Sequence, residues 1–181
     1  EIEVADAGEL SSDTTKAKSV DSVTSAAAEA AEEAAAEEDA IVTGTIEKAD
    51  DNTLTLTTDE GTYTFNTKIA QKVSKDGIKS GVQADVTYYG DLEDETDKPV
   101  ATKIVTEDAM DSEDAKINTL SGKVAEVGAD YVVIDTADPV NTLFTFLGKE
   151  GMFDKLKIGD TATIIYKGTL TDKTITATGV K

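Results

Sequence analysis

Short runs in which apolar and polar residues alternate recur along residues 41–181. Alternation with a period of two places apolar side chains on one face of a β-strand and polar side chains on the other. Such runs, separated by turn residues such as Asp, Asn and Gly, are typical of a small barrel or sandwich. They predict strands near 42–47, 53–57, 62–65, 83–89 and 100–105, and again near 119–126, 131–136, 142–147, 161–167 and 174–180.

The two sets of strands are copies of one pattern, offset by about 78 residues. Thr43-Gly44-Thr45-Ile46 corresponds to Ser121-Gly122-Lys123-Val124, and the block from Gly81 to Leu92 corresponds to the block from Gly159 to Leu170. A nearly constant offset indicates tandem duplication. In each copy a segment without alternation crosses from the third strand to the fourth, and helix-compatible residues in the first of these segments predict a short helix. The two crossing segments are 70–78 and 149–157.

The order of three strands, a short helix and two strands resembles the OB-fold. The residues that carry this resemblance are Gly44-Thr45-Ile46 in the first strand, Ile78-Lys79-Ser80-Gly81 before the fourth, and Tyr88 with Gly90 at its end. The pattern is similar to the OB-like repeats of secreted or lipid-anchored surface proteins of Gram-positive bacteria. The resemblance implies a mostly β chain with two tandem five-stranded OB-like Greek-key barrels, each with one short helix. It carries over no functional residue.

Charge divides the chain into four expected segments. These are an acidic N-terminal extension at 1–40, a first OB-like repeat at 41–106, an acidic linker at 107–117 and a second OB-like repeat at 118–181. Residues 1–40 hold 12 acidic and 2 basic residues, residues 41–117 hold 17 and 8, and residues 118–181 hold 8 and 7. The second repeat is therefore almost neutral, and most of the net charge of -20 lies before it.

The extension has two interpretations. Its Ala/Glu run from Ala26 to Ala40 predicts a partly helical segment, since both residue types favour helices. Such a segment is typical of a solvated spacer. Alternatively, the alternating start with Ile2 and Val4 acts as a docking element that adds a strand to an exposed sheet edge. The start at Glu1 instead of Met suggests that a signal peptide or leader has been removed.

Composition then excludes many functions. Arg, His, Cys and Trp are absent, which removes the commonest general base, thiol chemistry, disulfides, and His or Cys metal sites. We therefore expect no enzyme and no cofactor. The negative charge predicts that nucleic acid is not a partner, because such binding depends on basic residues that neutralise phosphate. No window of about 18 apolar residues predicts a transmembrane segment.

Three kinds of candidate site remain. The hairpin residues Asp91, Glu93, Asp94 and Asp97 offer oxygen ligands for calcium, although solvated turn residues are the alternative. Tyr131, Val133 and Ile165 are apolar or aromatic residues on the outward faces of strands, and they are candidates for a surface at which the repeats pack together or meet another protein. Tyr89 is expected to point outward and offers a weak platform for a glycan or peptide ligand. A pair of carboxylates that hydrolyses glycosides ranks third among the functions.

These observations favour a non-enzymatic extracellular or cell-surface structural module that assembles with protein partners, copies of itself included. The extension then serves as spacer or as the strand-adding element of a filament, with Ile2, Val4, Tyr131, Val133 and Ile165 as candidate assembly residues. The alternative is a surface module that binds carbohydrate or peptide on a barrel face.

Overall fold

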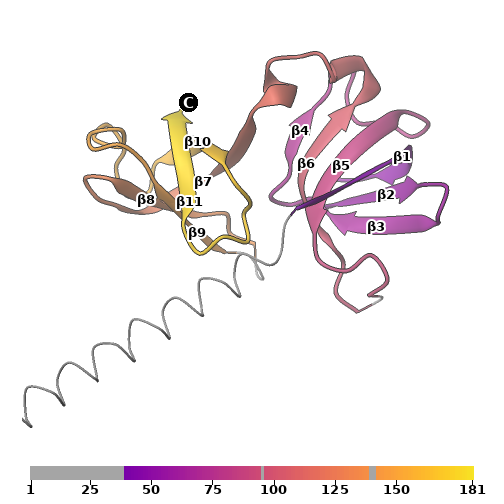
Figure 1. Ribbon diagram of the computed structural model, residues 1–181, viewed down its shortest axis with the longest axis horizontal. Helices are drawn as coiled ribbons and strands as arrows, with labels where there is room; N and C mark the ends of the chain where they lie inside the picture. The colour runs from indigo at the N-terminus through magenta and orange to yellow at the C-terminus, as the bar shows by residue number, and fades with distance from the viewer. Residues whose placement is uncertain (1–38, 95, 139–141) are drawn as a thin grey trace, which may run out of the picture. The chain divides into compact units, whose positions relative to one another are not determined.

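The computed structural model describes residues 39–94, 96–138 and 142–181, which form β-strands joined by turns (Figure 1). The expected partial helix of the extension and the alternating segment with Ile2 and Val4 lie outside the described residues. Among the described residues, no helix has the length and apolar character needed to cross a bilayer.

The first repeat forms a ring of five strands. They are β1 (Ala40–Ala49), β2 (Thr53–Thr57), β3 (Thr62–Asn66), β5 (Gln83–Tyr89) and β6 (Val100–Thr106). Strand β1 pairs antiparallel with both β2 and β5, β2 pairs with β3, and β5 pairs with β6. A parallel pairing of Asn66 with Val100 joins β3 to β6 and closes the ring. The short strand β4 (Gln71–Val73) lies parallel to β6 outside this ring.

The second repeat forms a closed barrel with the same strand order. Its strands are β7 (Asn118–Val127), β8 (Tyr131–Asp135), β9 (Leu143–Leu147), β10 (Thr161–Lys167) and β11 (Ile175–Val180). As in the first repeat, the first strand pairs with the second and the fourth, and a parallel pairing between the third and fifth strands completes the ring. The prediction of a mostly β chain with two OB-like barrels is confirmed, and the strand positions agree closely with those expected.

The short helix expected in each crossing segment is not formed. In the first repeat, residues 71–73 pair with β6 as β4 and turns follow. In the second, residues 150–155 form turns without a helix. The described helical turns are two 3₁₀ segments in the linker, η1 (Glu107–Ala109) and η2 (Asp114–Lys116). Residues 71–73 form a strand although their types are compatible with a helix, because pairing with β6 satisfies the backbone hydrogen bonds of β4.

Matching aromatic pairs lie inside the two barrels. Phe65 meets Tyr88 in the first repeat, with ring centroids 5.4 Å apart, and Phe146 meets Tyr166 in the second, at 5.8 Å. These separations are typical of favourable edge or tilted aromatic contacts. Alternation directs these four side chains inward: Phe65, Phe146 and Tyr166 are buried, and Tyr88 packs partly buried against the core.

Candidate functional site

An apolar strip lies on the outer surface of β8 and β9 in the second barrel. We call it the β8–β9 outer strip, and it consists of Tyr131, Val133, Leu143 and Leu147. The inward residues of β9, Phe144 and Phe146, are buried, so alternation turns the two leucines outward, where they are 61% and 43% exposed. The β8–β9 register pairs Tyr131 with Leu147, Val133 with Thr145 and Asp135 with Leu143, so Tyr131 lies opposite Leu147 and Val133 lies diagonal to both leucines.

One edge of β9 is only partly paired. The parallel ladder from β11 to β9 joins Ile175 to Phe146 and Thr176 to Leu147. The first part of β9, from Leu143 to Thr145, therefore has no ladder partner from β11 among the described residues. Backbone groups at such an edge are a template for pairing with another strand.

Tyr131 is held in place at the end of the strip. Its hydroxyl donates a hydrogen bond to a carboxylate oxygen of Glu126 on β7, and this bond raises the pKa of the phenol. A Cβ atom added at Gly128 would lie only 2.2 Å from the ring, so the ring covers a site that only glycine leaves free. The strip thus ends in an oriented aromatic side chain instead of a mobile one.

The structure brings together two of the three assembly candidates on strands. Tyr131 and Val133 share the strip, whereas Ile165 lies on β10, which is paired with β7 and β11. Sequence reasoning missed Leu143 and Leu147. Comparison of the repeats contained the signal, because the corresponding residues of β2 and β3 are polar: Thr53, Thr55, Thr62 and Asn66 stand where the second repeat has Tyr131, Val133, Leu143 and Leu147.

Residues other than those expected connect the repeats. Ile69 and Val100 of the first repeat belong to the buried cluster formed by the core of the second. Tyr89 packs partly buried against the same cluster, so the expectation that it points outward into solvent is wrong. By alternation Tyr89 lies on the outward face of β5, but contacts between the repeats cover it. No local sequence pattern encodes such a contact.

The candidate calcium residues lie in the loop between β5 and β6. Asp91, Asp94 and Asp97, together with Tyr89, line a cavity of about 600 Å³, and Glu93 is not among its lining residues. Asp91 accepts a hydrogen bond from the backbone N–H of Glu93, and Asp94 accepts from those of Thr96 and Asp97. These carboxylates stabilise their own turns, as Asp commonly does. The described residues contain no group of three acidic side chains placed to hold a metal ion. Calcium binding remains a prediction.

Asp39, immediately before β1, is an unusual carboxyl group. It is half-buried, and its Oδ1 atom has no hydrogen-bond partner. Burial, with a smaller contribution from the negative charge of Asp172, raises its pKa from 3.8 to about 6. The same carboxylate contributes to the raised pKa of buried Tyr166, whose main cause is burial. Asp39 therefore disfavours the folded state when it is ionised.

This carboxyl group predicts a pH dependence of stability. The folded pKa of about 6 exceeds the unfolded value of 3.8, so the folded state holds the extra proton between these values and the free energy of unfolding falls as pH rises from about 4 to about 6. Because Asp39 is partly solvated, we expect Asp39→Asn to stabilise the protein at pH 7.5 by only about 1 kcal/mol. The measurement is urea denaturation of both proteins at pH 7.5 and pH 4. An equal difference at the two pH values would contradict the assignment.

Comparisons with known proteins assign no function to the chain. No protein-family model matches the chain, and no curated protein matches it. Among solved structures, the chain is similar to one titled "drosophila Unr CSD456", with 13% sequence identity and a TM-score of 0.26. The match covers 81% of this chain and 62% of that chain, less than two thirds of its length.

The expectation that nucleic acid is not a partner requires a correction. The match to the structure titled "drosophila Unr CSD456" conflicts with this expectation, which no longer stands as a conclusion from composition. The physical reason is that a net charge of -20 is a sum over the whole chain and does not describe each local surface. Nucleic acid is therefore no longer excluded as a partner, and a similarity with a TM-score of 0.26 identifies no ligand.

Proposed function

We propose that this chain is a non-enzymatic, extracellular or cell-surface assembly module, of the kind formed by tandem OB-like repeats in secreted or lipid-anchored surface proteins of Gram-positive bacteria. In this proposal the N-terminal segment of one copy docks on the second barrel of another. The observation that carries it is the exposure of Leu143 and Leu147 beside the partly paired edge of β9.

The chemistry of the segment and that of the strip are complementary. Residues 1–4 alternate acidic and apolar residues, so a strand formed on β9 turns Ile2 and Val4 to one face. On that face they contact the β8–β9 outer strip, while Glu1 and Glu3 face water. Addition of a strand to an open edge gains affinity from backbone hydrogen bonds and specificity from alternate side chains.

Charge also favours the second barrel as the docking surface. Two copies of a chain with a net charge of -20 repel each other, and the repulsion is weakest where the local charge is smallest. Residues 118–181 hold 8 acidic and 7 basic residues, whereas residues 41–117 hold 17 and 8. A contact between an extension and a barrel is head-to-tail, and such contacts produce closed rings, or filaments where the rotation between copies does not close.

The test is replacement of both exposed leucines by aspartate. We expect the Leu143→Asp/Leu147→Asp variant to weaken association by about 100-fold, because two apolar side chains lose roughly 1.5 kcal/mol each of burial. Light scattering over a concentration series measures the change in mass, and electron microscopy distinguishes filaments from single particles. Deletion of residues 1–4 is expected to have the same effect.

Ile158→Asp is the matched control. Ile158 is 70% exposed in the turn before β10, so the substitution adds an aspartate to the same barrel outside the strip, one charge against the two of the leucine variant. It is expected to leave association unchanged. A wild-type protein that stays monomeric at concentrations of about 1 mM, where contacts of about -4 kcal/mol are detected, would refute the assembly proposal. Association that survives the deletion but not the leucine variant would instead indicate contact between strips.

A further inference from the structure

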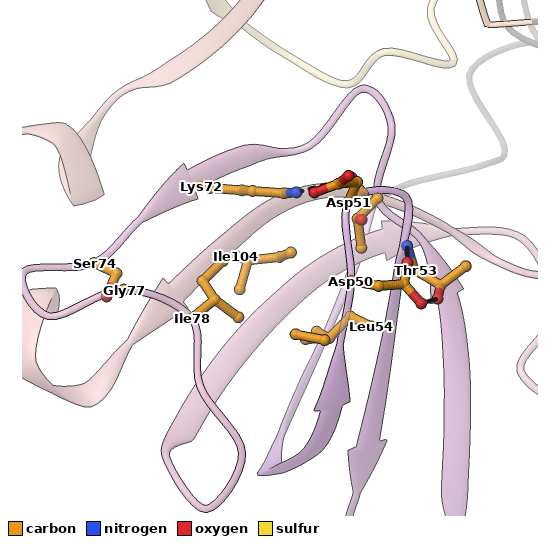
Figure 2. A pocket seen from close by; sticks show the side chains of 11 residues that line it. Asp50, Asp51, Thr53, Leu54, Lys72, Ser74, Gly77, Ile78 and Ile104 are labelled. Atoms are coloured by element: carbon orange, nitrogen blue, oxygen red, sulfur yellow. Dashed lines mark hydrogen bonds between the residues drawn. The ribbon is translucent and has the colours of Figure 1, made fainter.

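A cavity of about 410 Å³ opens at one end of the first barrel (Figure 2). Its apolar lining includes Leu54 and Ile104, which belong to the barrel core, together with partly buried Ile78. Polar groups of the β1–β2 turn and of the segment after β3 also line it. Its volume falls within the range of about 300–1,000 Å³ that is typical of small-molecule sites.

Two hydroxyl groups in this cavity have no hydrogen-bond partner. Thr67 is only 2% exposed, and its Oγ1 atom is buried and unpaired. The Oγ atom of Ser74 is likewise buried and unpaired, and both residues line the cavity. A buried hydroxyl without a partner costs about 1–3 kcal/mol, so each of the two groups is stabilised by a polar partner bound in the cavity.

In the second repeat, an aromatic side chain closes the corresponding end of the barrel. Thr67 follows β3 directly, as Gly148 follows β9. A Cβ atom at Gly148 would lie 2.8 Å from the ring of Phe153 and 2.8 Å from the sulfur of Met152. Phe153 is fully buried in the core. In the second barrel, an aromatic ring therefore fills the place that the Thr67 hydroxyl occupies in the first barrel.

The remaining polar groups define the ligand chemistry. Lys72 donates one hydrogen bond to the backbone carbonyl of Asp51, at 3.1 Å, and an ammonium group has two further donors. Asp50 accepts from the backbone N–H of Thr53 at 2.8 Å and from its hydroxyl at 2.7 Å, and these bonds hold the carboxylate in place and lower its pKa. Figure 2 shows Lys72 directed at Asp51 on one rim of the cavity.

We propose that this cavity binds one ring of a neutral sugar. Sugar hydroxyls both donate and accept, which matches the unpaired hydroxyls of Thr67 and Ser74, the carboxylates and the ammonium group of Lys72. The carbon face of the ring packs on Leu54, Ile78 and Ile104. An anionic ligand is disfavoured by Asp50 and Asp51 and by a repeat with about twice as many acidic as basic residues. Water alone would require on the order of ten molecules to fill the cavity.

The test uses glucose, galactose and N-acetylglucosamine as probes, with glucuronate and inorganic phosphate as anionic comparators. Protein amide NMR shifts are followed up to about 20 mM, a range that detects millimolar dissociation constants. We expect at least one neutral sugar to shift the amides of Thr67 and Ser74, and the two anions not to do so. No shift with any of the three sugars would overturn the proposal, and so would equal or stronger binding of an anion.

Thr67→Val separates binding from folding. Valine keeps the shape of threonine and removes the unpaired hydroxyl, so the free protein is expected to keep or raise its melting temperature while sugar affinity falls about tenfold. Ser74→Ala is a second variant with the same expected direction. Thr45→Val, at an exposed position of β1, is the matched control and is expected to leave affinity unchanged. Unchanged affinity in both cavity variants would refute the site. The self-association described above is independent of these results.

Discussion

Replacing Phe153 by alanine is expected to lower the free energy of unfolding by about 3–5 kcal/mol. The ring is fully buried, and it closes the end of the second barrel against Gly148. Its removal takes away the apolar area of a whole aromatic side chain and leaves a cavity that the neighbouring strands fill only in part. Urea denaturation, with the midpoint and slope measured separately, tests this expectation.

Two controls accompany this variant. Phe153→Leu keeps most of the volume, and its cost is expected to be clearly smaller than that of alanine. Ile158→Ala, at a residue that is 70% exposed in the same segment, is expected to change stability by less than about 0.5 kcal/mol. A loss below about 1 kcal/mol for Phe153→Ala would mean that the ring does not close the barrel, and the contrast with the cavity of the first repeat would lose its basis.

The two repeats differ in complementary ways. The second barrel is plugged by Phe153, is nearly neutral and carries the β8–β9 outer strip. The first has a polar cavity at the corresponding end, an acidic surface and threonines where the strip would be. A duplicated fold in which one copy contacts proteins and the other binds a small ligand is physically coherent, because each difference affects a surface or barrel end and leaves the ring of strands unchanged.

The strands were predictable from the sequence because alternation reports a local property. Thr53–Thr57 and Gln83–Tyr89, for example, begin and end where the pattern placed them. The crossing segments were not predictable in this way, since the conformation of residues 71–73 depends on pairing with β6, about 30 residues further along the chain. The expectation about Tyr89 was wrong for a similar reason, because the burial of this residue depends on a cluster formed mainly by the second repeat.

The candidate site residues also divide into those that the sequence could predict and those that it could not. Tyr131 and Val133 were identified because outward apolar residues interrupt an otherwise polar face. Leu143 and Leu147 were equally visible in a comparison of the repeats. The unpaired hydroxyl of Thr67 was not predictable, since threonine is common along this chain and only the folded barrel shows which hydroxyl lacks a partner.

The repeated glycine of the first strand predicts a second large loss of stability. Gly44 lies where β1 leaves its pairing with β5 and begins its pairing with β2, since Thr45 pairs with both neighbouring strands. A Cβ atom there would lie 2.5 Å from the carbonyl oxygen of Thr57. Gly122 occupies the same place in the second barrel, 2.5 Å from the carbonyl oxygen of Asp135. We expect Gly44→Ala and Gly122→Ala each to cost about 1–3 kcal/mol or more, because a backbone carbonyl cannot move aside as a side chain can.

Gly61→Ala is the matched control for both variants. The nearest atom to its added Cβ is the hydroxyl oxygen of Tyr63 at 3.4 Å, close to ordinary contact, so the change is expected to stay within about 0.5 kcal/mol. Melting temperatures by circular dichroism compare the three variants with the wild type. If Gly44→Ala and Gly122→Ala were as stable as Gly61→Ala, the strands would not approach as closely as described at this corner. The match between Thr43-Gly44-Thr45-Ile46 and Ser121-Gly122-Lys123-Val124 would then need a cause other than the turn that the first strand makes between its two partners.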